Sequence, residues 1–334
     1  MKNKIIIFSI LILTFFACSK NTFKVDVELT NANGKTIYLQ RIIDNHIVNL
    51  DSAVIKNNKA EFNVKLNNNN DAYHIFVDGW KRNLPFFSDN NDVKINGDFN
   101  SQHKINITAS QTQNLLNEYI RKINTIDDND KAGFITEIVK NTPRSELTTY
   151  IVYKYKWAFD LKELKNIIKI YPRDYNSSYY KKLNEYINMI EKTEPGNKYI
   201  DIVLDNTEGQ TVSLSSIVEN NKLVLLDFWA SWCPDCRVEN PNIVEIYNEF
   251  KDKGLEIVSV SLDTDKDAWI KGIEEDNLSW NNHLSDLKGW NCVPASKYGV
   301  AFIPQNFLIS SDGIIVAKNL NGDDLKLMIA KKLR

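Results

Sequence analysis

The sequence predicts three structural parts of different class: an antiparallel β domain at residues 18–109, a helical connecting region with its linker at 110–193, and an α/β domain at 194–334. Three observations support this division. The first part has short runs of alternating polar and apolar residues between turn signals, and the second has apolar residues at helical spacing. In the third, a short apolar strand leads directly into an amphipathic helix. With 334 residues and 43% hydrophobic content, the chain can bury more than one core.

The β domain is predicted by alternation and by turns. The alternating runs are 23–29, 36–39 and 60–64. Turn signals such as Asn33-Gly34 and Asn96-Gly97 separate them. Together with Asp51-Ser52-Ala53 and 95–99, this pattern resembles the β domain of unknown function that often precedes thioredoxin-like modules in Gram-negative lipoproteins. The resemblance implies no activity for this part.

The connecting region is predicted to be helical because its apolar residues recur every three to four positions, as at Leu116, Ile120 and Ile123. Further helices are expected at 134–139, 146–157, 161–170 and 175–190. Pro143 and Pro172 interrupt the helical pattern between them. The aromatic residues of this stretch fit core packing, with a binding surface as the alternative. They are Tyr150, Tyr153, Tyr155 and Trp157.

The segment Trp232-Cys233-Pro234-Asp235-Cys236 is the most informative of the chain, because two thiols three positions apart can close as a disulfide. It follows a β-branched and aromatic run at 223–229, which fits a buried strand. The residues after it are spaced for one apolar face of a helix. They are Val238, Ile243, Val244, Ile246, Tyr247 and Phe250. At the start of that helix, free backbone N–H groups and the helix dipole favour the thiolate of Cys233, and Cys236 is expected to be more buried. Pro234 suits the first helical turn.

The residues around this pair resemble a known family. The segment 227–236 is similar to the active-site segment of thioredoxin, and 236–241 is similar to the bacterial periplasmic thioredoxin-like reductases of the TlpA and ResA type. Further matches are Ile303-Pro304, the strand at 305–309 and the turn at 311–313. The resemblance covers roughly residues 196–334 and implies a thioredoxin-like fold for the α/β domain.

The resemblance also implies roles for individual residues. Cys233 would attack a substrate disulfide, and Cys236 would resolve the mixed disulfide. The residues expected to contact the substrate are Trp232, Pro234, Ile303 and Pro304. Pro304 would be a cis-proline that lies against the disulfide, and the Ile303 backbone would dock the substrate chain beside it. These motifs require no metal and no organic cofactor.

Two carboxylates are candidates for accepting the proton of Cys236. Asp227 matches the buried carboxylate of thioredoxin, and Glu239 matches the acidic residue three positions after the second cysteine in ResA-like proteins. We prefer Glu239, because the ResA-like resemblance covers more of the domain. The alternatives are an ordinary strand-end residue for Asp227 and an exposed first-turn acid for Glu239. Asp235 opposes the helix dipole and makes the thiolate less favourable, which favours a reductant over a strong oxidant.

The N-terminal residues predict export. Two lysines precede an apolar stretch at 5–16 that is too short to span a bilayer and suits a signal-peptide core. Phe16-Ala17-Cys18-Ser19 reads as a lipoprotein cleavage site, so that residues 1–17 are a signal peptide and Cys18 carries the lipid. The expected location is the periplasm, with contact to a bacterial membrane through the lipid anchor only. A plain secreted protein or a retained anchor is the alternative.

Charge and cysteine usage limit the other functions. The net charge of −2 gives no electrostatic basis for nucleic-acid binding. A zinc site is not expected, because no second Cys/His pair is suitably placed and the four histidines are scattered. Cys292 is interpreted as a small core or surface residue, with a resolving or regulatory thiol as the alternative.

The sequence therefore predicts a membrane-tethered periplasmic thiol-disulfide oxidoreductase that reduces disulfide-bearing protein substrates. The family resemblance implies a transmembrane thiol relay as its electron donor. Two rivals remain. One is a thiol peroxidase of the AhpC/TSA kind, which shares the fold but needs a single peroxidatic cysteine. The other is a non-enzymatic scaffold or binding lipoprotein, in which the β and helical parts act and the disulfide is vestigial.

Overall fold

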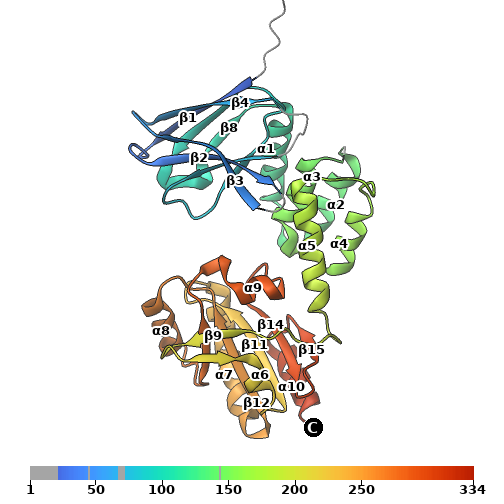
Figure 1. Ribbon diagram of the computed structural model, residues 1–334. Helices are drawn as coiled ribbons and strands as arrows, with labels where there is room; N and C mark the ends of the chain where they lie inside the picture. Colours follow the sequence, from blue (N-terminus) through green and yellow to red (C-terminus); the bar gives the residue numbers. More distant parts are fainter. Residues whose placement is uncertain (1–21, 44–45, 67–71, 143) are drawn as a thin grey trace, which may run out of the picture. The chain divides into compact units, whose positions relative to one another are not determined.

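The computed structural model describes residues 22–43, 46–66, 72–142 and 144–334 (Figure 1). These residues form two compact units that divide between Thr125 and Ile126. The expected signal peptide at 1–17, the lipidation site Cys18 and the helix-breaking Pro143 lie outside the described residues. Within the described ranges, no helix combines the length and the apolar character needed to cross a bilayer.

The first unit contains two four-stranded sheets. One has the order β4 (Lys59–Lys65), β1 (Thr22–Thr30), β7 (Val93–Asp98) and β8 (Asn106–Thr108). The other has the order β3 (His46–Val54), β2 (Thr36–Ile43), β5 (Tyr73–Val77) and β6 (Leu84–Phe86). Neighbouring strands are antiparallel, except that β1 and β7 run parallel. The predicted N-terminal domain of antiparallel sheets is confirmed.

The core of this unit follows from alternation along its strands. In β1, every second residue is buried, namely Phe23, Val25, Val27 and Leu29. These side chains join one apolar cluster with residues of both sheets, such as Ile37 and Ile95. A short 3-10 segment (Phe99–Lys104) and helix α1 (Gln111–Ile123) complete the unit. Ser110 caps α1 by accepting a hydrogen bond from the Gln113 N–H.

The second unit begins with residues 126–193 of the predicted helical region, whose first helix, α1, belongs to the first unit. The helices of residues 126–193 are α2 (Lys131–Asn141), α3 (Glu146–Lys154), α4 (Leu161–Ile168) and α5 (Ser178–Lys192), with 3-10 turns at Asp128–Asp130 and Lys156–Ala158. Core packing is the observed role of Tyr150 and Tyr155, which are buried, and the ring of Tyr150 lies edge-on to that of Tyr179 on α5. Buried Glu146 accepts the Tyr179 N–H and thereby joins α3 to α5.

The rest of the second unit is a seven-stranded sheet with helices on both faces (Figure 1). Its order is β10 (Thr211–Ser213), β9 (Val203–Asn206), β13 (Asn282–Ser285), β12 (Leu255–Ser261), β11 (Leu223–Trp229), β14 (Gln305–Ser310) and β15 (Ile315–Lys318). The helices are α6 (Leu214–Val218), α7 (Pro234–Phe250), α8 (Lys266–Glu275), α9 (Val293–Tyr298) and α10 (Gly322–Lys332), with 3-10 turns at Lys251–Lys253 and Gly289–Asn291. Strand β11 is parallel to β12 and antiparallel to β14, which is a thioredoxin-like arrangement.

The helical region is fastened to this sheet through the linker. The Gly196 N–H donates to the Ile315 carbonyl, and the Thr193 hydroxyl donates to the Tyr298 carbonyl. The Tyr298 hydroxyl in turn donates to the Ile200 carbonyl. These bonds tie the segment after α5 to the strand β15 and to α9.

Candidate functional site

The two cysteines lie where the sequence predicted, on the turn between a buried strand and a helix. All seven residues of β11 are buried, and α7 starts at Pro234 directly after the N-cap residue Cys233. Cys233 and Cys236 form a disulfide. The Cys233 Sγ also accepts a hydrogen bond from the Cys236 N–H, at 3.1 Å. The sulfur therefore uses one of the free N–H groups that a helix offers at its start.

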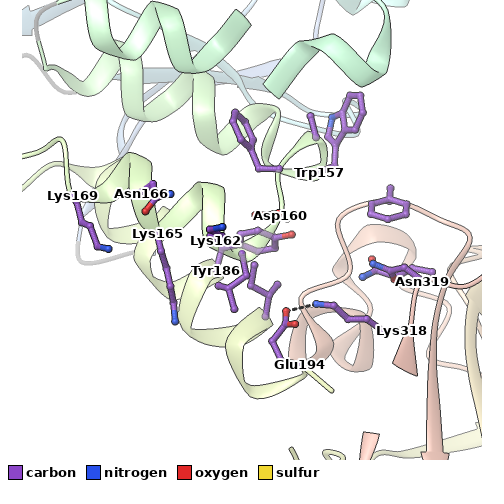
Figure 2. Close-up of a pocket in the computed structure, with 16 residues that line it drawn as sticks. Trp157, Asp160, Lys162, Lys165, Asn166, Lys169, Tyr186, Glu194, Lys318 and Asn319 are labelled. Carbon is purple, nitrogen blue, oxygen red and sulfur yellow. Dashed lines mark hydrogen bonds and ion pairs between the residues drawn. The ribbon is translucent and has the colours of Figure 1, made fainter. Parts of the chain in front are cut away.

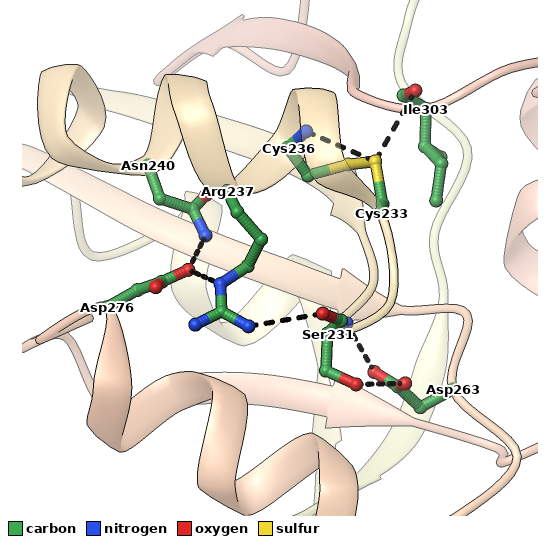
Figure 3. The surroundings of a disulfide bond; sticks show 8 residues. All are labelled: Ser231, Cys233, Cys236, Arg237, Asn240, Asp263, Asp276 and Ile303. Atoms are coloured by element: carbon green, nitrogen blue, oxygen red, sulfur yellow. Dashed lines mark hydrogen bonds and ion pairs between the residues drawn. A yellow bond between two sulfur atoms is a disulfide. The ribbon is translucent and has the colours of Figure 1, made fainter.

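The surroundings of the disulfide include the expected cis-proline. The Ile303–Pro304 peptide bond is cis, and the Cys233 Sγ lies 3.7 Å from the Ile303 carbonyl oxygen (Figure 3). Cys236 is 1% exposed, as expected for the inner cysteine. Cys233, in the oxidised state, is 4% exposed. The bond to Cys236 and the neighbouring Ile303 backbone cover it.

Three aromatic side chains close to the disulfide segment in sequence or in space are exposed. Trp232 is 50% exposed, and its ring centroid lies 6.3 Å from that of Trp290, which is equally exposed. Phe302, next to the cis-peptide, is also exposed. Sequence reasoning selected Trp232 but missed Trp290 and Phe302, because an aromatic residue in a loop carries no signal of what lies beside it in space.

A polar network supports the turn from below (Figure 3). Asp263 is 1% exposed, and it accepts hydrogen bonds from the Ser231 N–H, the Ser231 hydroxyl and the Ser261 hydroxyl. Gly272 of α8 allows the close approach of this turn, because a Cβ there would lie 2.8 Å from the Ser231 Cβ. These bonds fix the backbone that leads into Cys233.

Arg237 extends this support on the first turns of α7. Its Nη1 donates to the Ser231 carbonyl at 3.2 Å, and its guanidinium forms ion pairs with Glu275 and Asp276 (Figure 3). Asn240, also on α7, donates to the same Asp276 carboxylate at 2.6 Å. Sequence reasoning missed this network, since its members come from three separate segments.

Asp227 is a buried carboxylate without full hydrogen bonding. It lies in β11 and is 2% exposed, and its Oδ1 has no hydrogen-bond partner among the described residues. Burial, followed by the negative charge of Glu239, raises the pKa of Asp227 to about 7. Cys236 and Glu239 both belong to the buried face of α7.

Glu239 is buried but fully engaged. Its Oε1 accepts the Gly322 N–H at 2.7 Å, and its Oε2 accepts the Asn242 side-chain amide at 3.0 Å. Gly322 is the first residue of α10, so the Glu239 carboxylate occupies the N-terminus of that helix. The exposed first-turn position that was the alternative for Glu239 is wrong, since the side chain is only 9% exposed.

The predicted apolar face of α7 needs one correction. Val238 is 76% exposed, whereas Ile243, Ile246 and Phe250 are buried as expected. The buried face is continued toward the N-terminus by Cys236, Glu239 and Asn240. Polar residues can occupy these buried positions because each has a hydrogen-bond partner. Glu239 accepts from the first residue of α10, and Asn240 donates to Asp276.

Cys292 is separate from the disulfide. It is a free, fully buried cysteine, and burial raises the pKa of its thiol to about 12. It belongs to the apolar core of the domain, which agrees with its interpretation as a small core residue. Throughout the described ranges, no group of three or more potential metal ligands comes together.

The fold and the site define a thioredoxin-like protein with a Cys-x-x-Cys disulfide at the start of the helix after its central strand. A family model described as the AhpC/TSA family matches residues 195–318. A second model, described as a domain of unknown function (DUF4369), matches residues 23–116. The predicted β domain of unknown function is thereby confirmed.

Curated relatives cover the same C-terminal part. The thiol-disulfide oxidoreductase ResA of Halalkalibacterium halodurans is 30% identical over 127 residues, which are 38% of this chain and 69% of that protein. ResA of Bacillus cereus is 29% identical over 149 residues, which are 45% of this chain and 82% of that protein. A solved thioredoxin domain of a thiol-disulfide oxidoreductase from Bacteroides vulgatus is 36% identical and covers 42% of this chain and 99% of its own, with a TM-score of 0.40. The chain belongs to the ResA-like family of thiol-disulfide oxidoreductases, as its motifs predicted.

Proposed function

We propose that this chain reduces protein disulfides by dithiol exchange through Cys233 and Cys236. The observation that carries the proposal is the disulfide at the N-terminus of α7, with its outer sulfur beside the cis Ile303–Pro304 peptide. The observed disulfide corresponds to the product state of such a reaction. Its reduction to a dithiol regenerates the active form.

The reaction proceeds in two exchanges of sulfur bonds. The Cys233 thiolate attacks one sulfur of the substrate disulfide, forms a mixed disulfide and releases the other substrate sulfur as a thiolate, which takes a proton from solvent. The Cys236 thiol then loses its proton, and its thiolate attacks the Cys233 sulfur. This second step forms the Cys233–Cys236 disulfide and releases the second substrate sulfur as a thiolate, which takes a proton from solvent. Two electrons pass from the dithiol to the substrate.

The start of α7 supplies the electrostatic help for the first step. The Cys236 N–H points at the Cys233 sulfur, and the helix dipole adds positive potential at the same place. Both stabilise a thiolate at Cys233 more than a neutral thiol.

Asp227 is the group that we assign to accept the Cys236 proton. A general base works best when its pKa is near the working pH, and the pKa of Asp227 is raised to about 7. Its Oδ1 has no hydrogen-bond partner in the described chain and is free to take a proton. Both oxygens of Glu239 are already acceptors, so we assign Glu239 to positioning Asp227 and α10 instead of to proton transfer.

The substrate chain docks around the sulfur. The Ile303 carbonyl lies beside the Cys233 sulfur and is followed by the cis-proline Pro304, and Trp232 and Pro234 are exposed on the turn. Trp290 extends that apolar surface. Such a surface recognises an extended polypeptide mainly through its backbone and apolar side chains.

We further propose that the protein acts outside the cytoplasm, attached to a membrane through a lipid on Cys18 after removal of residues 1–17, and that a transmembrane thiol relay reduces it. The support is the signal-peptide and lipoprotein pattern of the N-terminal residues. Metabolic labelling with radioactive palmitate tests the anchor. Label should appear in the wild type and be absent from Cys18→Ser.

Trapping tests the chemistry. A Cys236→Ser variant should accumulate mixed disulfides with substrate proteins, visible on non-reducing gels, and Cys233→Ser should give none. Insulin reduction by the wild type should be lost in both. A reduction potential near −270 mV, as for thioredoxin, supports a reductant, whereas a value near −120 mV would reverse the direction.

A thiol peroxidase is the second candidate, because the matching family model is that of AhpC/TSA proteins. Turnover of hydrogen peroxide without turnover of insulin would favour it. Full cellular function of a Cys233→Ala variant would instead favour a binding or scaffold protein.

A further inference from the structure

A groove of about 660 Å³ lies beside the cis-proline loop, between the helical region and the thioredoxin-like sheet of the second unit (Figure 2). One wall comes from the 3-10 turn with Trp157, from α4 and from Tyr186 of α5. The other comes from Phe302, Gln305 and β15 with Lys318. Its volume lies within the range of about 300–1,000 Å³ that is usual for binding clefts.

The groove continues the proposed substrate surface. Phe302 lines it, and the carbonyl of the next residue, Ile303, lies 3.7 Å from the Cys233 sulfur. An extended chain advances about 3.3–3.6 Å per residue. A polypeptide whose cysteine reaches Cys233 therefore brings residues only a few positions away to the mouth of the groove.

The groove is positively charged along α4. Lys162, Lys165 and Lys169 are three or four positions apart and line the same side of the helix (Figure 2). Lys165 pairs with Glu191, which lies outside the groove lining. Lys162 and Lys169 are exposed, and no ion pair or hydrogen bond involves the ammonium group of either one among the described residues.

The two acids that line the groove do not cancel this charge. Glu194 pairs with Lys318 at 2.5 Å. Asp160 is the N-cap of α4 and accepts the Glu163 N–H at 2.7 Å. Its charge remains, but the lining holds four lysines against these two acids. The two free ammonium groups thus lie beside a floor that is partly aromatic, which suits a segment with both acidic and apolar side chains.

We propose that this groove binds an acidic segment of the disulfide-bearing polypeptide substrate, a few residues from the cysteine that Cys233 attacks. The inference rests on the proposed function and narrows its substrate class. The helical region then acts as a selectivity element for the thioredoxin-like domain.

Binding of a redox-inactive peptide tests the groove apart from the chemistry. The probe has serine in place of both cysteines and three glutamates on each side, and its match has glutamines instead. Titration of the oxidised full chain, followed by tryptophan fluorescence, should give a dissociation constant about five-fold lower for the glutamate peptide at low salt. The difference should shrink as salt rises, because the Debye length falls from about 30 Å at 0.01 M to about 3 Å at 1 M.

Charge reversal locates the effect. Lys162→Glu/Lys169→Glu should lose or invert the preference for glutamate. The matched control Lys266→Glu/Lys331→Glu changes the net charge equally at exposed lysines of α8 and α10 and should keep it. Equal binding of both peptides by the wild type, or equal loss in both variants, overturns the proposal.

A kinetic experiment separates this inference from the proposed function. Pre-reduced protein reacts in a single turnover with the disulfide forms of the two peptides, and the rate with bis(2-hydroxyethyl) disulfide serves as a reference for each variant. The glutamate peptide should react about five-fold faster, through a lower half-saturating concentration. Reduction of all three disulfides without a preference between the peptides overturns the proposal for the groove and leaves the proposed function standing. Preferential binding without any reduction upholds the groove and overturns the reductase.

Discussion

Two regions of the thioredoxin-like domain each bury a carboxylate, but they differ in the hydrogen bonds that they donate to it. In the middle of β11, Asp227 is 2% exposed and its Oδ1 lacks a hydrogen-bond partner in the described chain. Where α7 meets α10, Glu239 is 9% exposed and both of its oxygens accept hydrogen bonds. Burial disfavours the charged form of a carboxylate, whereas hydrogen bonds donated to its oxygens stabilise that form. Burial with missing hydrogen-bond donors therefore raises the pKa of Asp227, whereas the Glu239 oxygens both have donors.

The largest expected effect is on the pH dependence of the free energy of unfolding. The pKa of Asp227 is about 7 in the folded chain and about 3.8 when unfolded. The folded state therefore holds this proton more tightly, and its contribution to stability is complete below pH 3.8 and is lost as the pH rises to about 7. The difference corresponds to about 4 kcal/mol. Urea unfolding of the oxidised protein between pH 4 and 8 measures it, free of cysteine titration.

The matched variant for that measurement is Asp227→Asn, which cannot ionise. Its unfolding free energy should vary less with pH than that of the wild type over the same interval. An unchanged slope would show that other groups cause the pH dependence and that the contrast between the two regions is not electrostatic.

The next effect is on the rate of the second sulfur exchange. Asp227→Asn should lower disulfide exchange at pH 7 by about 100-fold, because general base catalysis typically contributes that much or more. The ionisation near pH 7 should vanish from the pH–rate profile, which is measured with a small disulfide substrate. Glu239→Gln should keep that ionisation and move it to lower pH, since it removes the negative charge that raises the pKa of Asp227. If Glu239→Gln abolishes the ionisation instead, the two assignments must be exchanged.

A smaller effect is expected at the α10 junction. Glu239→Ala removes the acceptor of the Gly322 N–H and should cost about 1–2 kcal/mol, as losing a helix cap does. Glu239→Gln retains an acceptor oxygen and should cost less. Urea midpoints at pH 5 give both values. Equal losses would mean that the charge, and not the hydrogen bond, holds α10.

The smallest effect concerns the residue just before Glu239. Val238 is 76% exposed, so Val238→Thr should change the unfolding free energy by less than about 0.5 kcal/mol. The equally conservative Ile243→Val, in the core, should cost about 0.5–1.5 kcal/mol. The same unfolding assay compares them. A large loss of unfolding free energy in Val238→Thr would contradict the exposed position of Val238.

Local patterns predicted much of the turn that carries the two cysteines correctly. The apolar run at 223–229 became β11, and Pro234 became the first residue of α7. Both follow from interactions between residues near one another in sequence, namely strand propensity and the tolerance of the first helical turn for proline. The cis-peptide at Pro304 was also expected, through the family resemblance.

Contacts between distant segments were not predictable. Val238 was predicted to lie on the apolar face of α7, but it is exposed. Glu239 and Asn240 are buried instead, because Glu239 hydrogen-bonds to Gly322 and Asn240 to Asp276. The support of the turn by Asp263 and Arg237 was missed for the same reason. A polar residue can enter a core only where a partner meets it, and the partner is chosen by the fold.

The sequence by itself determined the strand, the helix and the cysteine spacing of the turn with the disulfide, because these depend on residues within a few positions of each other. The tertiary structure alone decided which carboxylate lacks donors and which side chains line the groove beside Phe302. The physical reason is that burial, dielectric environment and hydrogen-bond satisfaction are properties of neighbours in space. Those neighbours come from segments as far apart in the chain as Trp157 and Lys318.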